Sequence, residues 1–340
     1  MLNIKFPALY CPFPSAINQY AEAAGKHSLK WARSFNLVID ESAYQSLRAT
    51  KFHVLAARCY PNACLEALEV VCDYLVWIFI ADDQFEEAGP RKQTELLQEL
   101  HARLLDILKG AELTDFDTSV QIALRDIRLR LQQLPHATSE LMLRFVENMT
   151  AYFEGVLCEV LNHLQGSVPD LATYMKIRSF TSGVFIYCDL IQIVDRIALP
   201  PEVIEHPTVK RLKLATNNVS TWANDIFSLQ KEVGEGQTHN LVVVLQHEYQ
   251  ISVQEAVERA VEIHDAEVRT FIELSAQLPS FGAQIDAELQ RYISGLRSWM
   301  RGCLDWYLET GRYCLTETGE ILEIRDWTAN LSRDSQFSQP

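Results

Sequence analysis

The sequence predicts a single all-α domain, and three observations support this. Glycine and proline are sparse, with 13 and 12 of the 340 residues, which disfavours a turn-rich β fold. Apolar residues recur three and four positions apart along most of the chain, and the β-branched run LVVVL at 241–245 is short and lies between helical segments. No linker separates two parts. We therefore expect one domain over residues 1–340, with 1–14 and 329–340 as peripheral or mobile segments.

The predicted helices follow one another between recognisable breakers. Apolar spacing marks a helix over residues 44–60, and Pro61 is placed in the first turn of the next helix, over 61–87. That helix is apolar on most faces near its end, which predicts a central position in the core. Proline in the first turn also predicts helix starts within residues 167–170 and 199–202. Further helices are expected at 91–110, 117–134, 138–165, 170–198, 201–233, 237–249, 253–278 and 282–312.

Composition and charge exclude several classes of protein. The net charge is −15 and no Lys/Arg-rich run is present, so we expect no nucleic-acid partner. The eight cysteines form no CxxC pair, which fits reduced core thiols rather than a zinc or redox motif. The N-terminus lacks a signal-peptide pattern, and the apolar run Leu75–Ala81 falls far short of the ~20 residues of a membrane span. We expect a cytoplasmic monomer or homodimer with no stable membrane insertion.

An acidic cluster ends the apolar segment that precedes Gly89–Pro90. Asp82, Asp83 and Glu86 read D-D-x-x-E, and Asp82 and Glu86 share one helix face. Like charges at this spacing destabilise a helix by about 0.2–0.5 kcal/mol, and the negative end of the helix dipole adds to the cost. A bound divalent cation would reverse both effects, and Mg²⁺ is typically held by one or two carboxylates with water and phosphate oxygens. A solvated acidic helix end is the alternative.

A second polar cluster lies about 140 residues further along the chain. Asn224, Ser228 and Glu232 are spaced i, i+4 and i+8, so they form a stripe ~12 Å long on one helix face. All three offer hard oxygen donors, which suit Mg²⁺ better than zinc or copper. Lys231 beside them is a candidate phosphate partner. An exposed polar face is the alternative, although neighbours such as Trp222 make the segment apolar.

Together, the motifs D-D-x-x-(D/E) and N-D-x-x-S-x-x-K-E resemble those of the class I terpene synthase family, in its microbial single-domain form. Arg178 lies 46 residues before Asn224, where the family places its diphosphate-sensing arginine. Arg312 and Tyr313 match the family's Arg-Tyr pair near the C-terminus. The resemblance covers nearly the whole chain.

This resemblance implies a helical bundle with a central apolar cavity and two motifs facing each other across its mouth. It implies three Mg²⁺ ions, with Mn²⁺ as an expected substitute. The implied metal ligands are Asp82, Asp83, Glu86, Asn224, Ser228 and Glu232, and the implied diphosphate contacts are Arg178, Lys231, Arg312 and Tyr313. The family often has Asp and Gly three and four positions after the sensor arginine. Here Thr181 and Ser182 stand there, followed by Gly183, so the Ser182 carbonyl or flexibility at Gly183 is expected to couple diphosphate binding to a helix break.

The implied reaction ionises an allylic carbon–oxygen bond and leaves a carbocation in an apolar cavity. Aromatic faces can stabilise such a cation by about 0.5–2 kcal/mol each. Phe79, Phe185 and Trp306 are the catalytic candidates, and ordinary core packing is the alternative for each. Further aromatic candidates are Trp77 and Trp222, with Phe52 and Phe153 behind them. The histidines His53, His239 and His247 are expected to be structural.

We therefore expect Mg²⁺-dependent cyclisation of farnesyl diphosphate to a sesquiterpene hydrocarbon or alcohol with release of diphosphate. A diterpene synthase using geranylgeranyl diphosphate is the main alternative. An isoprenyl diphosphate synthase would carry a second Asp-rich motif where Asn224, Ser228 and Glu232 stand. A cyclase that protonates an alkene would need D-x-D-D, which the DFDT at 115–118 does not provide. A non-catalytic helical scaffold is the remaining alternative.

Overall fold

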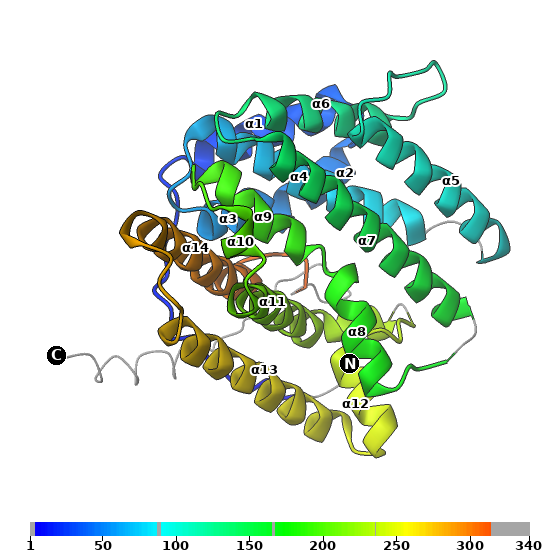
Figure 1. Ribbon diagram of the computed structural model, residues 1–340. Helices are drawn as coiled ribbons and strands as arrows, with labels where there is room; N and C mark the ends of the chain where they lie inside the picture. The colour runs from blue at the N-terminus through cyan, green and yellow to red at the C-terminus, as the bar shows by residue number, and fades with distance from the viewer. Residues whose placement is uncertain (1–3, 87–89, 165–166, 235, 314–340) are drawn as a thin grey trace.

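The computed structural model describes residues 4–86, 90–164, 167–234 and 236–313. Within these ranges the chain forms fourteen α-helices and no β-strand (Figure 1), which confirms the predicted all-α class. The helices are α1 Ala21–Ser34, α2 Glu41–Thr50, α3 Phe52–Cys59, α4 Leu65–Glu86, α5 Pro90–Leu108, α6 Ser119–Gln133, α7 Ser139–Leu164, α8 Leu171–Thr181, α9 Val184–Val194, α10 Pro201–Ile204, α11 Pro207–Gly234, α12 Leu241–Tyr249, α13 Val253–Ala276 and α14 Ala283–Tyr307.

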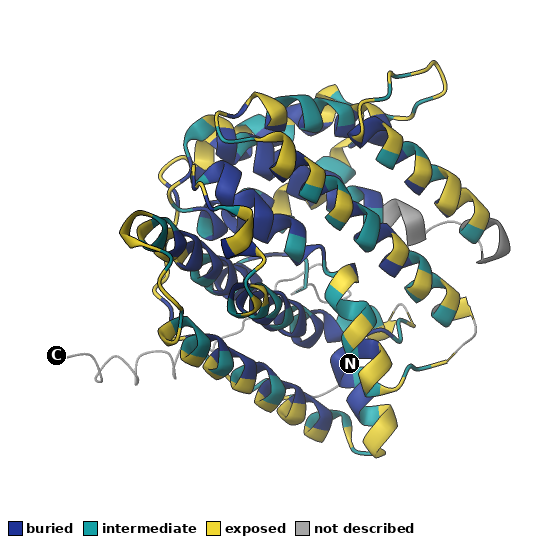
Figure 2. Ribbon diagram, viewed as in Figure 1, coloured by how far each residue is buried: buried dark blue, intermediate teal, exposed yellow. Residues whose placement is uncertain are grey.

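The core lies around α4, α9, α11 and α14. In α9 every residue except Phe185 is buried, and α9 packs against α7, α11 and α14. Helix α13 covers the outer side of α11, and α14 also packs on α3. Figure 2 shows the exposed residues gathered on the outer faces of α5, α7 and α13. The buried apolar side chains join into one contiguous hydrophobic cluster, which is the dominant stabilising element of such a fold.

Local sequence explains many of the helix ends. Asp170 caps α8 by accepting a hydrogen bond from the Thr173 N–H at 2.8 Å, and Ser252 begins α13 in a reciprocal capping box with Glu255. Pro201 occupies the first turn of α10, as expected from LPPE. These caps satisfy backbone groups that the first turn of a helix leaves without intrahelical partners.

Several predicted helix boundaries were wrong. The stretch 44–60 is two helices, because Lys51 adopts a left-handed conformation with φ of 53° between α2 and α3. Helix α4 begins at Leu65 rather than at Pro61, and α1 was not predicted. The stretch 201–233 is divided into α10 and α11, and α14 ends at Tyr307, before Arg312. The predicted mobile segment 329–340 lies outside the described residues.

The predicted helix 170–198 is also divided, at Gly183. This glycine has φ of +67°, a left-handed conformation that side-chain-bearing residues rarely adopt, and it separates α8 from α9. The Ser182 hydroxyl accepts from the Val184 N–H at 3.2 Å and donates to the Asn217 side-chain oxygen at 2.7 Å. The break therefore has its own hydrogen bonds.

The break also bears on the question of a membrane span. By length and composition Leu171–Val194 could cross a membrane, but 67% of its most apolar window is buried inside the protein. The stretch is two short helices joined at Gly183, and most of its buried residues belong to α9.

Helix α14 approaches α3 closely at Gly302. A Cβ atom added there would lie 2.8 Å from backbone atoms of Arg58 and Cys59, so a larger residue would push the helices apart. Arg58 in turn pairs with Asp305 on α14 and with Glu309, which follows that helix. The cysteines that the structure describes are all free thiols, and most are buried as expected, but Cys64 is half-buried and Cys158 is exposed.

Candidate active site

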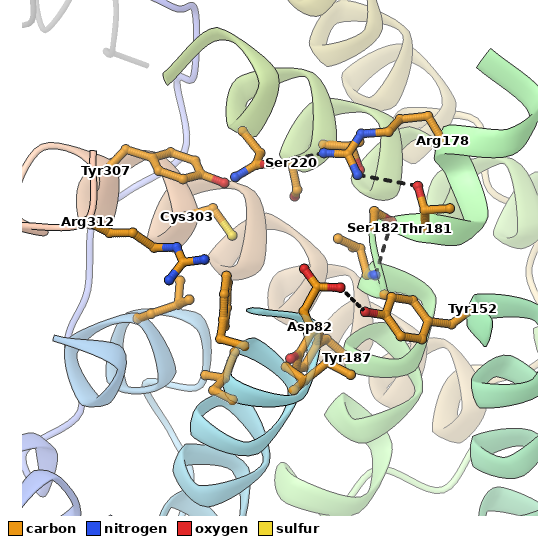
Figure 3. Close-up of a pocket in the computed structure, with 18 of the residues that line it drawn as sticks. Asp82, Tyr152, Arg178, Thr181, Ser182, Tyr187, Ser220, Cys303, Tyr307 and Arg312 are labelled. Atoms are coloured by element: carbon orange, nitrogen blue, oxygen red, sulfur yellow. Dashed lines mark hydrogen bonds between the residues drawn. The ribbon is translucent and has the colours of Figure 1, made fainter. Parts of the chain in front are cut away.

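One cavity of about 210 Å³ opens in the middle of the bundle. Residues far apart in the sequence line it: Asp82 from α4, Arg178 from α8, Asn224, Lys231 and Glu232 from α11, and Arg312 and Tyr313 from the segment after α14. Figure 3 shows Arg178 and Arg312 on opposite sides of this cavity, with Asp82 between them. The fold therefore brings both predicted polar clusters to one place.

On the α11 wall of the cavity, Asn224 contacts two of the predicted diphosphate-binding residues, Arg178 and Tyr313. The Asn224 side-chain oxygen accepts a hydrogen bond from Arg178 Nη2 at 2.9 Å. Its amide nitrogen donates to the Tyr313 hydroxyl at 3.2 Å. Burial raises the pKa of Tyr313, so its hydroxyl stays protonated and can donate to an anion. Asn224 thus links Arg178, the predicted sensor, to Tyr313.

Ser228 and Glu232 continue the α11 stripe. The Ser228 hydroxyl is buried, donates to the Asn224 carbonyl at 2.7 Å and is hydrogen-bonded to Glu232, but Ser228 is not among the residues that line the cavity. Asn240 donates to Glu232 Oε2 at 2.9 Å. Burial raises the pKa of Glu232, and the nearby carboxylate of Asp225 raises it further.

The chemistry of these donors fits a divalent cation. A carboxylate whose charged form is disfavoured by burial would be stabilised by a cation beside it, and an amide, a hydroxyl and a carboxylate are hard oxygen ligands. Among the described residues there is no group of three or more His, Cys, Asp or Glu that could hold a metal. That result is consistent with this set, since two of the three α11 donors are Asn and Ser.

The first acidic cluster is described only in part. The half-buried Asp82 lines the cavity and accepts a hydrogen bond from the Tyr152 hydroxyl at 3.0 Å. Asp83 and Glu86 belong to α4, but their side chains lie outside the described residues. Asp82 is therefore the one member of this motif whose place in the cavity is known.

Arg178 is held by a buried carboxylate. Its Nη2 and Nε lie 2.7 and 3.0 Å from Asp225 Oδ1, and Asp225 is fully buried. Asp225 also accepts hydrogen bonds from the Tyr174 hydroxyl and, at 2.7 Å, from the Leu241 N–H. Burial acts to lower the pKa of Arg178, but the surrounding anions, Asp225 foremost, raise it well above its ordinary value. The guanidinium is thus charged and fixed in position before any substrate binds.

Thr181 stands where the family often has an aspartate, and a carboxylate from another helix contacts it. Thr181 Oγ1 donates to Glu159 Oε1 on α7 at 2.6 Å and accepts from Arg178 Nη1 at 3.4 Å. His239 Nδ1 lies 3.5 Å from the same Glu159 oxygen. Thr181, Ser182, Glu159 and His239 all line the cavity. Glu159 was missed from sequence because its partner is on a different helix.

A chain of hydrogen bonds fixes the segment that carries Arg312 and Tyr313. The Thr50 carbonyl at the end of α2 accepts from Trp306 Nε1 and from the Thr310 hydroxyl, both at 2.8 Å. The Gly311 N–H donates to the Ala49 carbonyl at 3.0 Å. The two candidate diphosphate contacts after α14 are therefore positioned by the corner between α2 and α3.

Two of the three predicted catalytic aromatics line the cavity. Phe79 and Trp306 do so, and Phe52 stacks on both with ring-centre distances of 4.4 and 5.8 Å. The Arg312 guanidinium lies 4.8 Å from the Phe79 ring centre, within cation–π range. Phe52 thus packs behind the two lining residues Phe79 and Trp306, as expected.

The prediction that Phe185 lines the cavity was wrong. Its ring is half-buried and lies 6.4 Å from that of Phe180, while Val184 and Tyr187 of the same helix face the cavity. A helical residue is rotated about 100° from its neighbour, which places Phe185 on another face. Trp77 is also outside the lining, and its Nε1 donates to the Val120 carbonyl.

Other aromatic residues that line the cavity were missed: Tyr152, Tyr187, Trp299 and Tyr307. The rings of Tyr187 and Trp299 stack with 4.5 Å between centres. In the sequence these residues share the apolar spacing of core residues. That spacing therefore cannot distinguish a side chain that lines the cavity from one that packs in the core.

Comparisons with known proteins show the family to which the chain belongs. The model of terpene synthase family 2, C-terminal metal binding, matches residues 73–270. Germacrene A synthase of Nostoc punctiforme is 40% identical over 325 residues, which is 96% of this chain and 100% of that protein. The (+)-T-muurolol synthase of Roseiflexus castenholzii is 36% identical over 312 residues, with 92% and 95% covered.

Solved structures give the same result for the fold. The SVS_A2 protein from ancestral sequence reconstruction superposes with a TM-score of 0.81 at 27% identity, covering 94% of this chain and 92% of that one. The α-eudesmol synthase structure superposes with a TM-score of 0.80 at 20% identity, covering 90% and 99%. At that lower identity the similarity concerns the fold.

Proposed function

The chain belongs to the terpene synthase family, and from this premise we propose that it converts farnesyl diphosphate to a sesquiterpene hydrocarbon or alcohol with release of diphosphate. Relatives that cover nearly the whole chain are named as synthases of germacrene A, T-muurolol and 10-epi-cubebol, and the second of these names includes farnesyl diphosphate cyclisation. These names favour a C15 over a C20 substrate. The observation that carries the proposal is the convergence of Asp82, Asn224, Glu232 and Arg178 on one cavity.

The matched family model is that of a metal-binding region, so the enzyme is expected to need a divalent metal. We propose Mg²⁺, in three ions, held by Asp82 with Asp83 or Glu86 and by Asn224, Ser228 and Glu232. When bound, Mg²⁺ neutralises the diphosphate and makes it a better leaving group. Oxygen donors from an amide, a hydroxyl and buried carboxylates support this choice of metal.

The cationic side chains are proposed to hold the leaving group. Arg178, Lys231 and Arg312 line the cavity, and the Tyr313 hydroxyl can donate to a phosphate oxygen. Negative charge develops on the diphosphate as the carbon–oxygen bond breaks, so donors fixed before the reaction stabilise the transition state more than the substrate. The ion pair of Arg178 with Asp225 supplies that fixed position on one side of the cavity.

The apolar part of the cavity receives the prenyl chain. Phe79, Trp306, Tyr187 and Trp299 line it, and their rings can face a carbocation without reacting with it. Such walls also exclude bulk water, which would quench the cation early. The shape of this lining then determines which ring closures occur.

Incubation of the purified chain with C10, C15 and C20 prenyl diphosphates tests the proposal. We expect farnesyl diphosphate with Mg²⁺ to give a volatile C15 product in gas chromatography and free diphosphate in equal amount. Neither should form when EDTA replaces the metal. A C20 product in preference would indicate the diterpene alternative, a longer diphosphate would indicate a chain-elongating enzyme, and no turnover would refute the proposal. Light scattering would separate the expected monomer from the homodimer.

A further inference from the structure

The wall of the cavity contains polar atoms that have no partner in the described part of the chain. They include the hydroxyls of Ser220, Thr221 and Tyr187 and the indole N–H of Trp299. All four residues line the cavity, and each is at most 5% exposed. A buried polar atom without a hydrogen bond costs free energy, so native proteins rarely keep several together unless a ligand or water satisfies them.

Ser220 and Thr221 lie on α11, one turn before Asn224. They therefore sit about 6 and about 4.5 Å along the helix axis from Asn224, in the direction away from Ser228 and Glu232. The polar stripe proposed for metal runs toward one end of α11, and the two hydroxyls lie beyond its other end. Figure 3 places Ser220 among the residues that line the cavity. They are therefore separate from the proposed metal ligands.

Two other hydroxyls of α11 bond to carbonyls within the helix. Thr216 donates to the Leu212 carbonyl at 3.0 Å, and Ser228 donates to the Asn224 carbonyl at 2.7 Å. Serine and threonine inside helices commonly bond in this way to the carbonyl four residues earlier. Ser220 and Thr221 make no such bond. Their hydroxyls therefore remain available to a ligand in the cavity.

The chemistry of the cavity restricts what that ligand is. The diphosphate is drawn to the cations and the metal motifs, and a hydrocarbon chain can neither donate nor accept a hydrogen bond. A water molecule both donates and accepts hydrogen bonds and needs two to four polar partners. The adjacent hydroxyls of Ser220 and Thr221 supply two. We propose that Ser220 and Thr221 hold a water molecule that adds to the carbocation, so that the product is an alcohol.

This inference rests on the proposed function, and its step balances. The water oxygen donates an electron pair to the cationic carbon, and a new carbon–oxygen bond forms. The resulting oxonium loses one proton to the diphosphate anion retained in the cavity. No oxidant or reductant is needed. Ser220 and Thr221 position the water and exchange no proton with the substrate.

The test uses farnesyl diphosphate, Mg²⁺ and buffer made with oxygen-18 water, with products identified by gas chromatography and mass spectrometry. The wild-type protein is expected to give mainly an alcohol that carries the heavy oxygen. In the double variant Ser220→Ala/Thr221→Val the ratio of alcohol to hydrocarbon is expected to fall roughly tenfold, since two hydrogen bonds to the water are lost. Total diphosphate release should change little.

Thr216→Val is the matched control, because this buried threonine is on the same helix, bonds to backbone and does not line the cavity. It should keep the wild-type product ratio. Ser220→Thr should also keep the alcohol, since it retains a hydroxyl. If circular dichroism shows that the double variant does not fold, Ser220→Ala and Thr221→Val are measured singly, and an unchanged ratio in both overturns the proposal.

Three further results would overturn it: a wild-type product that is only hydrocarbon, an alcohol without the label, or a folded double variant with an unchanged ratio. Each of these still leaves a working sesquiterpene synthase. Absence of any C15 product and of diphosphate release would instead refute the proposed function. The two failures are therefore distinguishable.

Discussion

The hydroxyl of Thr181 donates a 2.6 Å hydrogen bond to Glu159, a carboxylate on a different helix. Thr181 also accepts from Arg178, the predicted sensor arginine, and directly precedes the helix break at Ser182 and Gly183. A threonine alone brings no charge to this position. With Glu159 behind it, a carboxylate still acts on the arginine, and Glu159 is among the anions that raise the pKa of Arg178.

Glu159→Gln is expected to lower kcat about tenfold while the protein stays folded, because the amide keeps the size but removes the charge behind Thr181. Steady-state turnover of farnesyl diphosphate and circular dichroism would measure this. Glu154→Gln is the control, since Glu154 is an exposed residue of the same helix α7. Equal kcat in wild type and Glu159→Gln would show that Thr181 acts without the carboxylate.

Asp82→Ala and Asn224→Ala are each expected to reduce turnover by roughly a hundredfold or more, because they remove proposed metal ligands. Thermal unfolding with and without Mg²⁺ supplies a second measurement, since a bound ion stabilises the folded state. The wild type should gain stability with the metal and the variants should gain less. Glu66→Ala, an exposed change on α4, should behave as wild type. Full activity in either ligand variant would contradict the assignment.

Arg178→Ala is expected to abolish ionisation and also to lower stability by about 3–5 kcal/mol, because it leaves the buried Asp225 without its cation. Arg178→Lys keeps a charge but not the two contacts to Asp225, so it should recover stability more than turnover. Chemical denaturation and diphosphate release would separate the two effects. If Arg178→Ala unfolded at the wild-type denaturant concentration, the ion pair would not contribute as described.

Phe79→Ala and Phe185→Ala form a matched pair. Phe79 lines the cavity and faces Arg312, whereas Phe185 of α9 lies outside it. We expect Phe79→Ala to change the product mixture and Phe185→Ala to leave it unchanged, as judged by gas chromatography. A new product profile from Phe185→Ala alone would show that the cavity extends further along α9 when substrate is bound.

His27 makes stability dependent on pH. The hydrogen bond that His27 Nε2 donates to the fully buried carboxylate of Asp73 raises the pKa of His27 above its ordinary 6.5. The charged histidine therefore stabilises the fold at pH below its unfolded pKa, and this contribution is lost as the pH rises through the higher folded pKa. His27→Gln should lower the unfolding temperature more at pH 6 than at pH 9. An equal loss at both values would mean that His27 contributes through packing alone.

Much of the fold was predictable because helical spacing and breakers are local properties. The failures occurred where a break lay inside an apolar stretch, as at Gly183, or where a lysine took a left-handed conformation, as at Lys51. Both residues have positive φ values. Nothing in the spacing of nearby residues marks them.

The site was predictable where polar residues stood out against an apolar background. Asn224 and Glu232 were identified because their spacing put oxygen donors on one face of an otherwise apolar helix, and both line the cavity. Glu159, Tyr152 and Tyr187 could not be identified, since their roles come from partners on other helices. Asp83 and Glu86 stay predictions, because their side chains lie outside the described residues.

The corner at Thr50 has a consequence for protein engineering. The carbonyls of Ala49 and Thr50 anchor the segment that leads to Arg312. If Arg312 binds the diphosphate as proposed, the N-terminal helices help to position it although they carry none of the signature motifs. Chimeras that exchange the first sixty or so residues between homologous cyclases should therefore lose turnover unless the matching C-terminal segment is exchanged with them.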